Sequence, residues 1–148
     1  MDKKLANNFF KETSSAFAFL VNEHSFATPQ LEVNDKIHFA HVTFIGKNIA
    51  ITCSLDEREG DIDCRIALII DGKKATYRDA ISGIDERGTR VHESLYILLV
   101  RKGVRERLLT QITALGPHDR IKVTLADYAQ MLRKHGQEIL NDSPAALT

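Results

Sequence analysis

Residues 49 to 70 read IAITCSLDEREGDIDCRIALII, and this pattern predicts a β-hairpin. Apolar residues alternate with polar or small ones on both sides of a polar turn at residues 57 to 60. Alternation with a period of two is typical of a strand that buries one face. Pairing Leu55 with Ile62 gives every inward residue an apolar partner, and a shift of one residue would remove that match. The other inward pairs are then Cys53 with Cys64, Ile51 with Ile66, and Ile49 with Leu68.

The segment before this hairpin predicts another antiparallel strand, from residue 37 to residue 45. If residues 47 and 48 form a two-residue turn, this strand continues the buried face of the hairpin. The strand is apolar on its other side too, so either that side is also covered or a bulge near His41 switches the faces. The pairs expected on the buried face are Phe44 with Ile51 and Val42 with Cys53.

The N-terminal segment predicts a helix from residue 3 to residue 24 that lies across the sheet. Its apolar residues form an unusually wide and aromatic stripe. Pro29 then indicates a connecting loop. One sheet face and one helix layer are not expected to bury all of these side chains. Either the C-terminal helices cover the second sheet face or a second chain does, and we favour the second chain. The residues concerned are Phe9, Phe10, Phe17, Phe19 and Leu20, together with both sides of the first strand.

The rest of the chain is expected to be mostly helical. Asp71-Gly72 closes the third strand, residues 75 to 78 are expected to begin a fourth, and residues 79 to 90 to form a loop. The remaining elements predicted are a short helix around residues 95 to 99 ended by Gly103 (with a strand at 94 to 100 as the alternative), a helix from 104 to 115 stopped by Gly116-Pro117, and a last helix carrying Ile121 to Ile139.

These elements predict an α+β fold. An N-terminal helix packs on an antiparallel β-meander of three to four strands, and C-terminal helices follow. We expect residues 1 to 141 to form a single domain and residues 142 to 148 to be a flexible tail.

Composition narrows the classes of function. The chain has 148 residues, and 20 basic residues balance 20 acidic ones. A neutral chain lacks the basic footprint of a nucleic-acid-binding or membrane-surface protein, so we expect neither partner. No apolar run approaches the ~20 residues of a membrane span, and we interpret the N-terminus as carrying no signal peptide. Two cysteines fit a reducing compartment, so we expect a cytoplasmic protein.

The acidic turn is the first catalytic candidate, because hard metal ions prefer clustered carboxylate oxygens. The spacing does not match a calcium-binding loop, and the strand lacks the lysine of a nuclease-type site. We therefore favour a solvated hairpin turn, with a small metal-dependent enzyme as the alternative. The acids of the turn are Asp56, Glu57, Glu59, Asp61 and Asp63.

The remaining motifs are incomplete. His92-Glu93 lacks the second histidine of a zinc helix, because position 96 is Tyr96. His38 and His41 are expected to be partly buried and hydrogen-bonded rather than ligands. Cys53 and Cys64 are expected to be reduced core residues. The outer face of the hairpin carries Thr52, Ser54, Asp63 and Arg65, which predict no chemistry. We therefore predict no catalytic, cofactor-binding or metal-binding residue.

A basic run at residues 101 to 107 is the best binding candidate in the sequence. It carries four positive charges against one negative charge and suits an acidic partner protein or a nucleic-acid backbone. It lacks the aromatic residues that stack on bases, and cations are favourable at a helix C-terminus in any case. We therefore favour a structural role for this run.

The helix end FLVNEHSF, residues 19 to 26, followed by the first strands, resembles small uncharacterised bacterial proteins, several of which are similar to immunity or antitoxin partners. The resemblance covers the first half of the chain and brings no catalytic residues. The order of one helix and three strands is also similar to type III secretion chaperones, which are usually acidic, whereas this chain is neutral.

We hypothesise that the chain is a non-catalytic cytoplasmic protein that binds another protein or itself as a homodimer. The resemblance implies an immunity or antitoxin type of role. The alternatives are a metal-dependent enzyme that uses the acidic turn, a secretion-chaperone-like protein, and a structural subunit of a homo-oligomer.

Overall fold

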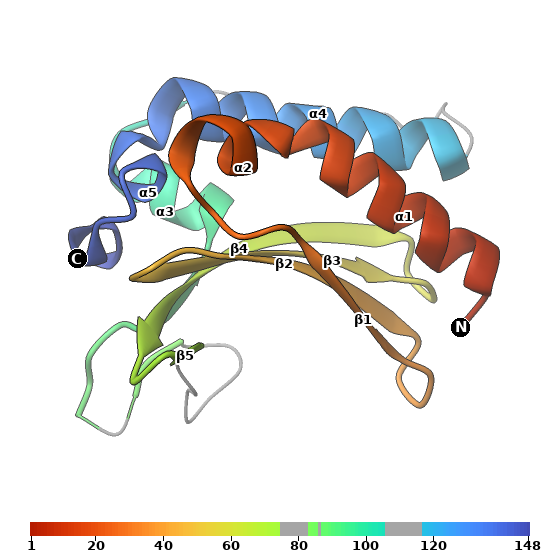
Figure 1. Ribbon diagram of the computed structural model, residues 1–148, viewed down its shortest axis with the longest axis horizontal. Helices are drawn as coiled ribbons and strands as arrows, with labels where there is room; N and C mark the ends of the chain where they lie inside the picture. The colour runs from red at the N-terminus through yellow and green to blue at the C-terminus, as the bar shows by residue number, and fades with distance from the viewer. Residues whose placement is uncertain (75–82, 86, 106–116) are drawn as a thin grey trace.

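The computed structural model describes residues 1–74, 83–85, 87–105 and 117–148. A layer of helices lies on one face of a curled antiparallel sheet (Figure 1). The sheet has the strand order β1-β2-β3-β4-β5, and β6 pairs with β4 off this path. The predicted α+β fold, with its N-terminal helix, antiparallel meander and C-terminal helices, is confirmed. The meander has five strands rather than three to four.

The central strands follow the predicted register. β2 (Phe39–Ile45), β3 (Ile49–Asp56) and β4 (Asp61–Ile70) are antiparallel neighbours. All predicted pairs are present, including Cys53 with Cys64 and Phe44 with Ile51. The apolar match across the rungs therefore determined the register, because a slip would expose the core side chains.

The N-terminal helix differs from the prediction in being broken. α1 (Lys3–Ala16) and α2 (Ala18–His24) meet at Phe17, whose backbone leaves the helical region. The hydroxyls of Thr13 and Ser14 donate to the carbonyl oxygens of Phe9 and Phe10, a kind of bond that often bends helices. The break lets the Phe17 ring pack against Phe44 of the sheet, with 5.9 Å between ring centroids.

Three short strands were missed, and they lie at the edges of the sheet. β1 (Gln30–Asn34) falls in the expected connection, and β6 (His92–Ser94) falls in the part expected to be helical. β5 (Lys73–Lys74) has only two residues. β1 has the sequence QLEVN, in which only Leu31 and Val33 alternate with polar residues and four of the five residues are exposed, so its apolar signal is weak. The predicted fourth strand at residues 75 to 78 lies outside the described residues, as does part of the predicted loop.

The C-terminal helices are partly as predicted. α3 (Leu95–Arg101) is a helix, so the strand alternative is wrong. α4 (Pro117–His135) begins at the proline, which is favourable in the first helical turn. α5 (Gln137–Leu140) is separated from α4 by Gly136, so the predicted single last helix is interrupted. The helix predicted for residues 104 to 115 lies outside the described residues, apart from Val104 and Arg105, which have no regular structure.

The last seven residues pack against the protein, whereas a flexible tail was expected. Residues 144–147 form a 3-10 helix, η2 (Pro144–Leu147), in which Ala146 and Leu147 are buried. The carboxylate of Asp142 accepts hydrogen bonds from the backbone N–H groups of residues 47, 48 and 49. The C-terminal segment therefore holds the turn between β2 and β3, and it belongs to the folded body.

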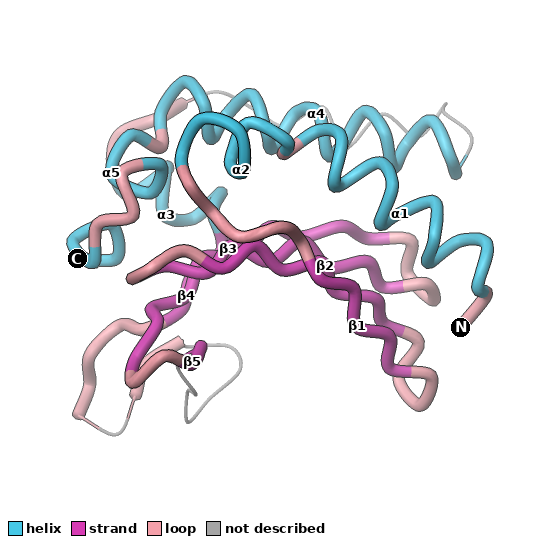
Figure 2. The backbone as a smooth tube through the Cα atoms, viewed as in Figure 1, coloured by secondary structure: helices cyan, strands magenta, loops and turns pink. Residues whose placement is uncertain are grey.

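The core lies between the sheet and the helices. Phe9, Phe17, Phe19 and Leu20 are buried there, and Phe10 packs against the core from its edge. The expectation that one sheet face and one helix layer leave these helix residues uncovered is therefore wrong. The other side of the first strand does stay partly uncovered, since Ile37 is exposed and Phe39 and Ile45 are only partly buried. α4 lies beside α1 over the same sheet face, which makes the helix layer wide enough (Figures 1 and 2).

Candidate functional site

The acidic turn joins β3 to β4, and its carboxylates make hydrogen bonds that stabilise the fold. The Asp56 carboxylate accepts from the backbone N–H groups of Arg58 and Glu59, and Gly60 takes a positive φ of 69°. Glu57 accepts from the backbone N–H of Asp2 and lies 3.0 Å from His38 Nδ1. The Asp2 hydrogen bond, and then the His38 contact, lower the pKa of Glu57, so this carboxylate fastens the N-terminus in its ionised form.

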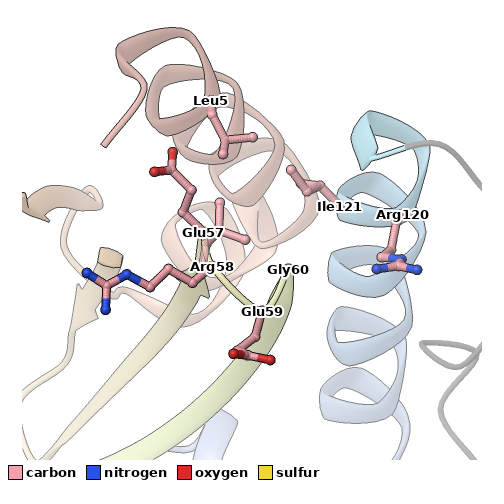
Figure 3. Close-up of a pocket in the computed structure, with 8 residues that line it drawn as sticks. Leu5, Glu57, Arg58, Glu59, Gly60, Arg120 and Ile121 are labelled. Atoms are coloured by element: carbon pink, nitrogen blue, oxygen red, sulfur yellow. The ribbon is translucent and has the colours of Figure 1, made fainter. Parts of the chain in front are cut away.

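A cavity of about 330 Å³ lies beside this turn (Figure 3). Leu5 of α1, Leu55 of β3 and Ile121 of α4 give it apolar walls. The other lining residues are Glu57, Arg58, Glu59, Gly60 and Arg120. In the part of the chain that the structure describes, no group of three or more His, Cys, Asp or Glu side chains is placed to hold a metal ion.

A second polar cluster lies on the sheet face opposite the helices, and the sheet register assembles it. Glu32, His41, Ser54 and Asp63 are consecutive cross-strand partners on β1 to β4. His41 Nδ1 lies 2.7 Å from Ser54 Oγ. We call this surface the polar face. Its residues are Glu32, His41, Thr43, Thr52, Ser54, Asp63, Arg65, Lys74, His92 and Ser94.

The basic groups of the polar face bond to their neighbours. Lys74 Nζ donates to Thr52 Oγ1 over 3.2 Å, which is consistent with the strong curl of the sheet near β5 (Figure 1). Arg65 donates to Asp63 over 3.2 Å and contacts the ring of His92 on β6. Ser94 Oγ lies 3.4 Å from Asp63 Oδ1. The result is a polar network in three separate parts, namely His41 with Ser54, Thr43 and Thr52 with Lys74, and Asp63 and Arg65 with His92 and Ser94.

The surroundings lower the pKa values of three bases in this network. Burial, followed by the charge of Lys74, lowers the pKa of His41. Burial, followed by the charges of Arg65 and Lys74, lowers the pKa of His92 to about 4. Lys74 is exposed as a residue, yet partial desolvation of its ammonium lowers its pKa as well. Both histidines are therefore neutral at pH 7 and available as hydrogen-bond acceptors.

The polar face resembles a catalytic arrangement only in part. A histidine within hydrogen-bond reach of a serine hydroxyl is the pairing of a base and a nucleophile, which normally needs a third group that orients the base. Among the described residues, no carboxylate hydrogen-bonds to His41. The sequence placed Thr52, Ser54, Asp63 and Arg65 on one face of the hairpin and His41 on the neighbouring predicted strand. It did not bring Glu32 and His92 to this face, because they lie on the missed strands β1 and β6.

The two histidines considered from the sequence are hydrogen-bonded, as predicted. His38 has a positive φ of 57° in the turn before β2 and contacts Glu57, whereas His41 contacts Ser54. Cys53 and Cys64 are buried, unbridged neighbours. Their mutual hydrogen bond and burial raise the pKa of Cys64, so it stays a thiol.

The described part of the basic run follows α3 and is partly paired. Arg101 forms an ion pair of 3.0 Å with Glu93, a buried carboxylate that also pairs with Arg90. Lys102 pairs with Glu138 of α5. Residues 106 and 107 of the run lie outside the described residues. α3 itself exposes Tyr96, Ile97 and Val100, which we call the α3 face.

No described helix combines the length and the apolar character that crossing a membrane requires. In comparisons with known proteins, no family model, no curated protein and no solved structure matches this chain significantly.

Proposed function

We propose that this chain is a non-catalytic cytoplasmic domain that binds another protein, and that the α3 face is the centre of the contact. The observation that carries the proposal is the exposure of three large apolar side chains on one short helix. Tyr96, Ile97 and Val100 are 39%, 45% and 40% exposed.

The pattern of α3 supports this proposal, because the helix is apolar on both sides. Leu95, Leu98 and Leu99 are buried against the protein, and the three residues of the α3 face project the other way. A helix at the surface of a soluble protein normally places polar residues toward water, and a helix that is apolar all round is normally buried. The outward side of α3 is therefore suited to a partner.

The charges beside the α3 face indicate the kind of partner. Arg101, Lys102 and Arg105 are exposed at the C-terminal end of α3. Ion pairs with Glu93 and Glu138 hold the first two in place at the rim of the patch. An apolar centre with a basic rim complements a protein surface with apolar residues and an acidic rim. A second copy of this chain would bring like charges near one another, so a different protein is favoured.

The size of the contact requires more than one helix. A stable interface buries roughly 800 Å² on each partner, more than the α3 face alone provides, so the rim must contribute too. A cavity of about 200 Å³ between α3 and α5 adjoins this region, and Leu99, Lys102 and Ile139 are among its lining residues. An immunity or antitoxin role, or a chaperone-like role, would be a specific form of this proposal.

The metal-dependent enzyme gains no support from the acidic turn. Asp56 accepts backbone hydrogen bonds within the turn, and Glu57 holds the N-terminus. Both groups therefore have a structural task that explains their positions.

Site-specific photo-crosslinking in the source cells tests the proposal. Tyr96 is replaced by benzoylphenylalanine, and Ile37, an exposed residue away from α3, carries the same group as the matched control. We expect a discrete heterologous adduct from position 96 alone. Ile97→Asp and Arg105→Glu should each reduce its yield, while thermal melting and circular dichroism show that both variants are folded.

Three outcomes would contradict the proposal. The absence of an adduct from position 96 would mean that no partner binds the α3 face. Equal yields of adduct from positions 37 and 96 would show indiscriminate contact. An adduct with twice the chain mass of 16.6 kDa would identify a second copy instead of another protein.

A further inference from the structure

The cavity beside the acidic turn forms where three distant segments of the chain meet. Leu5 comes from the first turns of α1, residues 57 to 60 from the turn between β3 and β4, and Arg120 and Ile121 from the start of α4 (Figure 3). Its volume of about 330 Å³ lies in the range of small-molecule sites. None of the functions considered above uses it.

The inner part of the cavity is apolar. Leu55 and Ile121 are almost completely buried, and Leu5 is half-buried. Side chains of this kind offer dispersion contacts and no hydrogen-bond partner to a water molecule. The inner part therefore suits an aliphatic or aromatic group.

Arg120 brings an unpartnered donor to the same cavity. Its Nε atom is buried and has no hydrogen-bond partner. A buried donor normally has an acceptor, and a charged donor forms the strongest hydrogen bonds. The unpartnered Nε therefore indicates that a ligand supplies the acceptor.

The neighbouring charges do not satisfy Arg120. Glu57 is taken up by the Asp2 backbone and His38, and within the described residues no ion pair joins Arg120 to Glu57 or Glu59. Arg58 projects from the turn away from α4 (Figure 3). Arg120 is thus the basic group on the α4 side of the cavity with a vacant bonding position.

The turn is shaped to keep this region open. Gly60 has a positive φ of 69°, and a Cβ atom added there would lie 3.5 Å from Arg120 Nη1. Its backbone N–H donates to the Asp56 carbonyl over 2.8 Å, which fixes the turn. A glycine here gives the turn its conformation and leaves the space in front of the guanidinium free of a side chain.

We propose that this cavity binds a small amphiphile with an anionic head group. The apolar part packs on Leu5, Leu55 and Ile121, and an oxygen of the head group accepts a hydrogen bond from Arg120 Nε. A carboxylate and a phosphate monoester share this chemistry, and both are good partners for a guanidinium. A neutral alcohol would satisfy the walls but make a weaker bond to the cation.

Titrations followed by NMR test the proposal with four probes. Octanoate and octyl phosphate carry both parts, octanol carries a neutral head, and acetate carries the head alone. We expect saturable shifts at the methyl groups of Leu5, Leu55 and Ile121 with the first two probes. The Arg120 Nε–H resonance should move downfield as it gains an acceptor, and the stronger of the two anionic probes identifies the head group. Octanol and acetate should bind about tenfold more weakly or not at all.

Two variants and a control complete the experiment. Arg120→Gln should weaken the binding of octanoate and octyl phosphate about tenfold and leave the binding of octanol unchanged. Leu5→Trp narrows the cavity and should weaken the binding of every probe that has an octyl chain. Arg133→Gln, on the same helix but away from the cavity, should change nothing. Unchanged thermal melting shows that each variant is folded.

The proposal would be overturned in three ways. It fails if the cavity resonances do not shift at millimolar octanoate and octyl phosphate, if octanol binds as tightly as the anions, or if Arg120→Gln leaves the anion affinity unchanged. None of these results depends on the α3 face, so the protein-binding proposal is tested separately.

Discussion

Arg65 Nη2 and His92 Nδ1 lie 2.9 Å apart on the polar face. The guanidinium is always charged and can only donate, so the imidazole nitrogen that faces it has to be a neutral acceptor. This contact joins β4 to the short strand β6 and makes the attachment of β6 sensitive to protonation.

We predict that His92 makes the folded state less stable in acid. The folded-state pKa is about 4, below the usual value near 6.5, so the unfolded chain binds the proton first as pH falls. The stability that neutral His92 contributes is lost progressively below pH ~6.5, and the loss is complete below pH ~4. Allowing for partial solvation, lowering the pH from 7 to 5 should reduce the free energy of unfolding of the wild type by about 1–2 kcal/mol more than that of His92→Gln. Urea unfolding at the two pH values measures this difference. Equal losses in both proteins would contradict the assignment.

The buried face of the hairpin makes a prediction about core stability. Ile66 is fully buried opposite Ile51, so Ile66→Ala should lower the free energy of unfolding by about 2–5 kcal/mol. Ile70 on the same strand is 47% exposed, and Ile70→Ala should cost less than about 1 kcal/mol. Denaturant unfolding measures both values, and similar losses would mean that the faces are assigned wrongly.

The C-terminal segment should contribute to stability through one carboxylate. Asp142 accepts three backbone hydrogen bonds at the turn between β2 and β3, over 2.6, 2.9 and 2.8 Å. Asp142→Ala leaves these donors without their acceptor and should cost about 1–3 kcal/mol. Asp142→Asn keeps one acceptor oxygen and tolerates the positive φ of 56°, so it should cost less. No loss in the alanine variant would show that the segment is dispensable.

Glu93 should be a stronger contributor than an ordinary surface acid. Its buried carboxylate pairs with Arg90 and Arg101, which links β6 to the end of α3. Glu93→Gln removes the charge without changing the shape and should cost about 1–3 kcal/mol. Glu23→Gln, which breaks an exposed pair with Arg133, should cost less than about 1 kcal/mol. Thermal unfolding of the two variants compares them directly, and equal effects would remove the special role of Glu93.

The sequence by itself determined the centre of the sheet. Ile49, Ile51 and Leu55 alternate with polar or small residues, and only one pairing with the next strand places every apolar residue on one side. The signal is local and repeated over many rungs, so it survives without any knowledge of the rest of the chain. The aromatic stripe of the first helix was readable for the same reason, although its break at Phe17 depends on packing against Phe44.

Only the tertiary structure decided the edges and the candidate sites. β1 and β6 are short and pair with strands already specified, so the partner strand stabilises them and their own sequence carries little signal. Glu32 and His92 therefore join Ser54 and Arg65 on the polar face through pairings between distant residues. The cavity at Arg120 depends in the same way on the meeting of α1, the acidic turn and α4. Burial of Ala146 and Leu147 likewise requires a surface that the rest of the fold creates, which no local pattern in residues 142 to 148 could reveal.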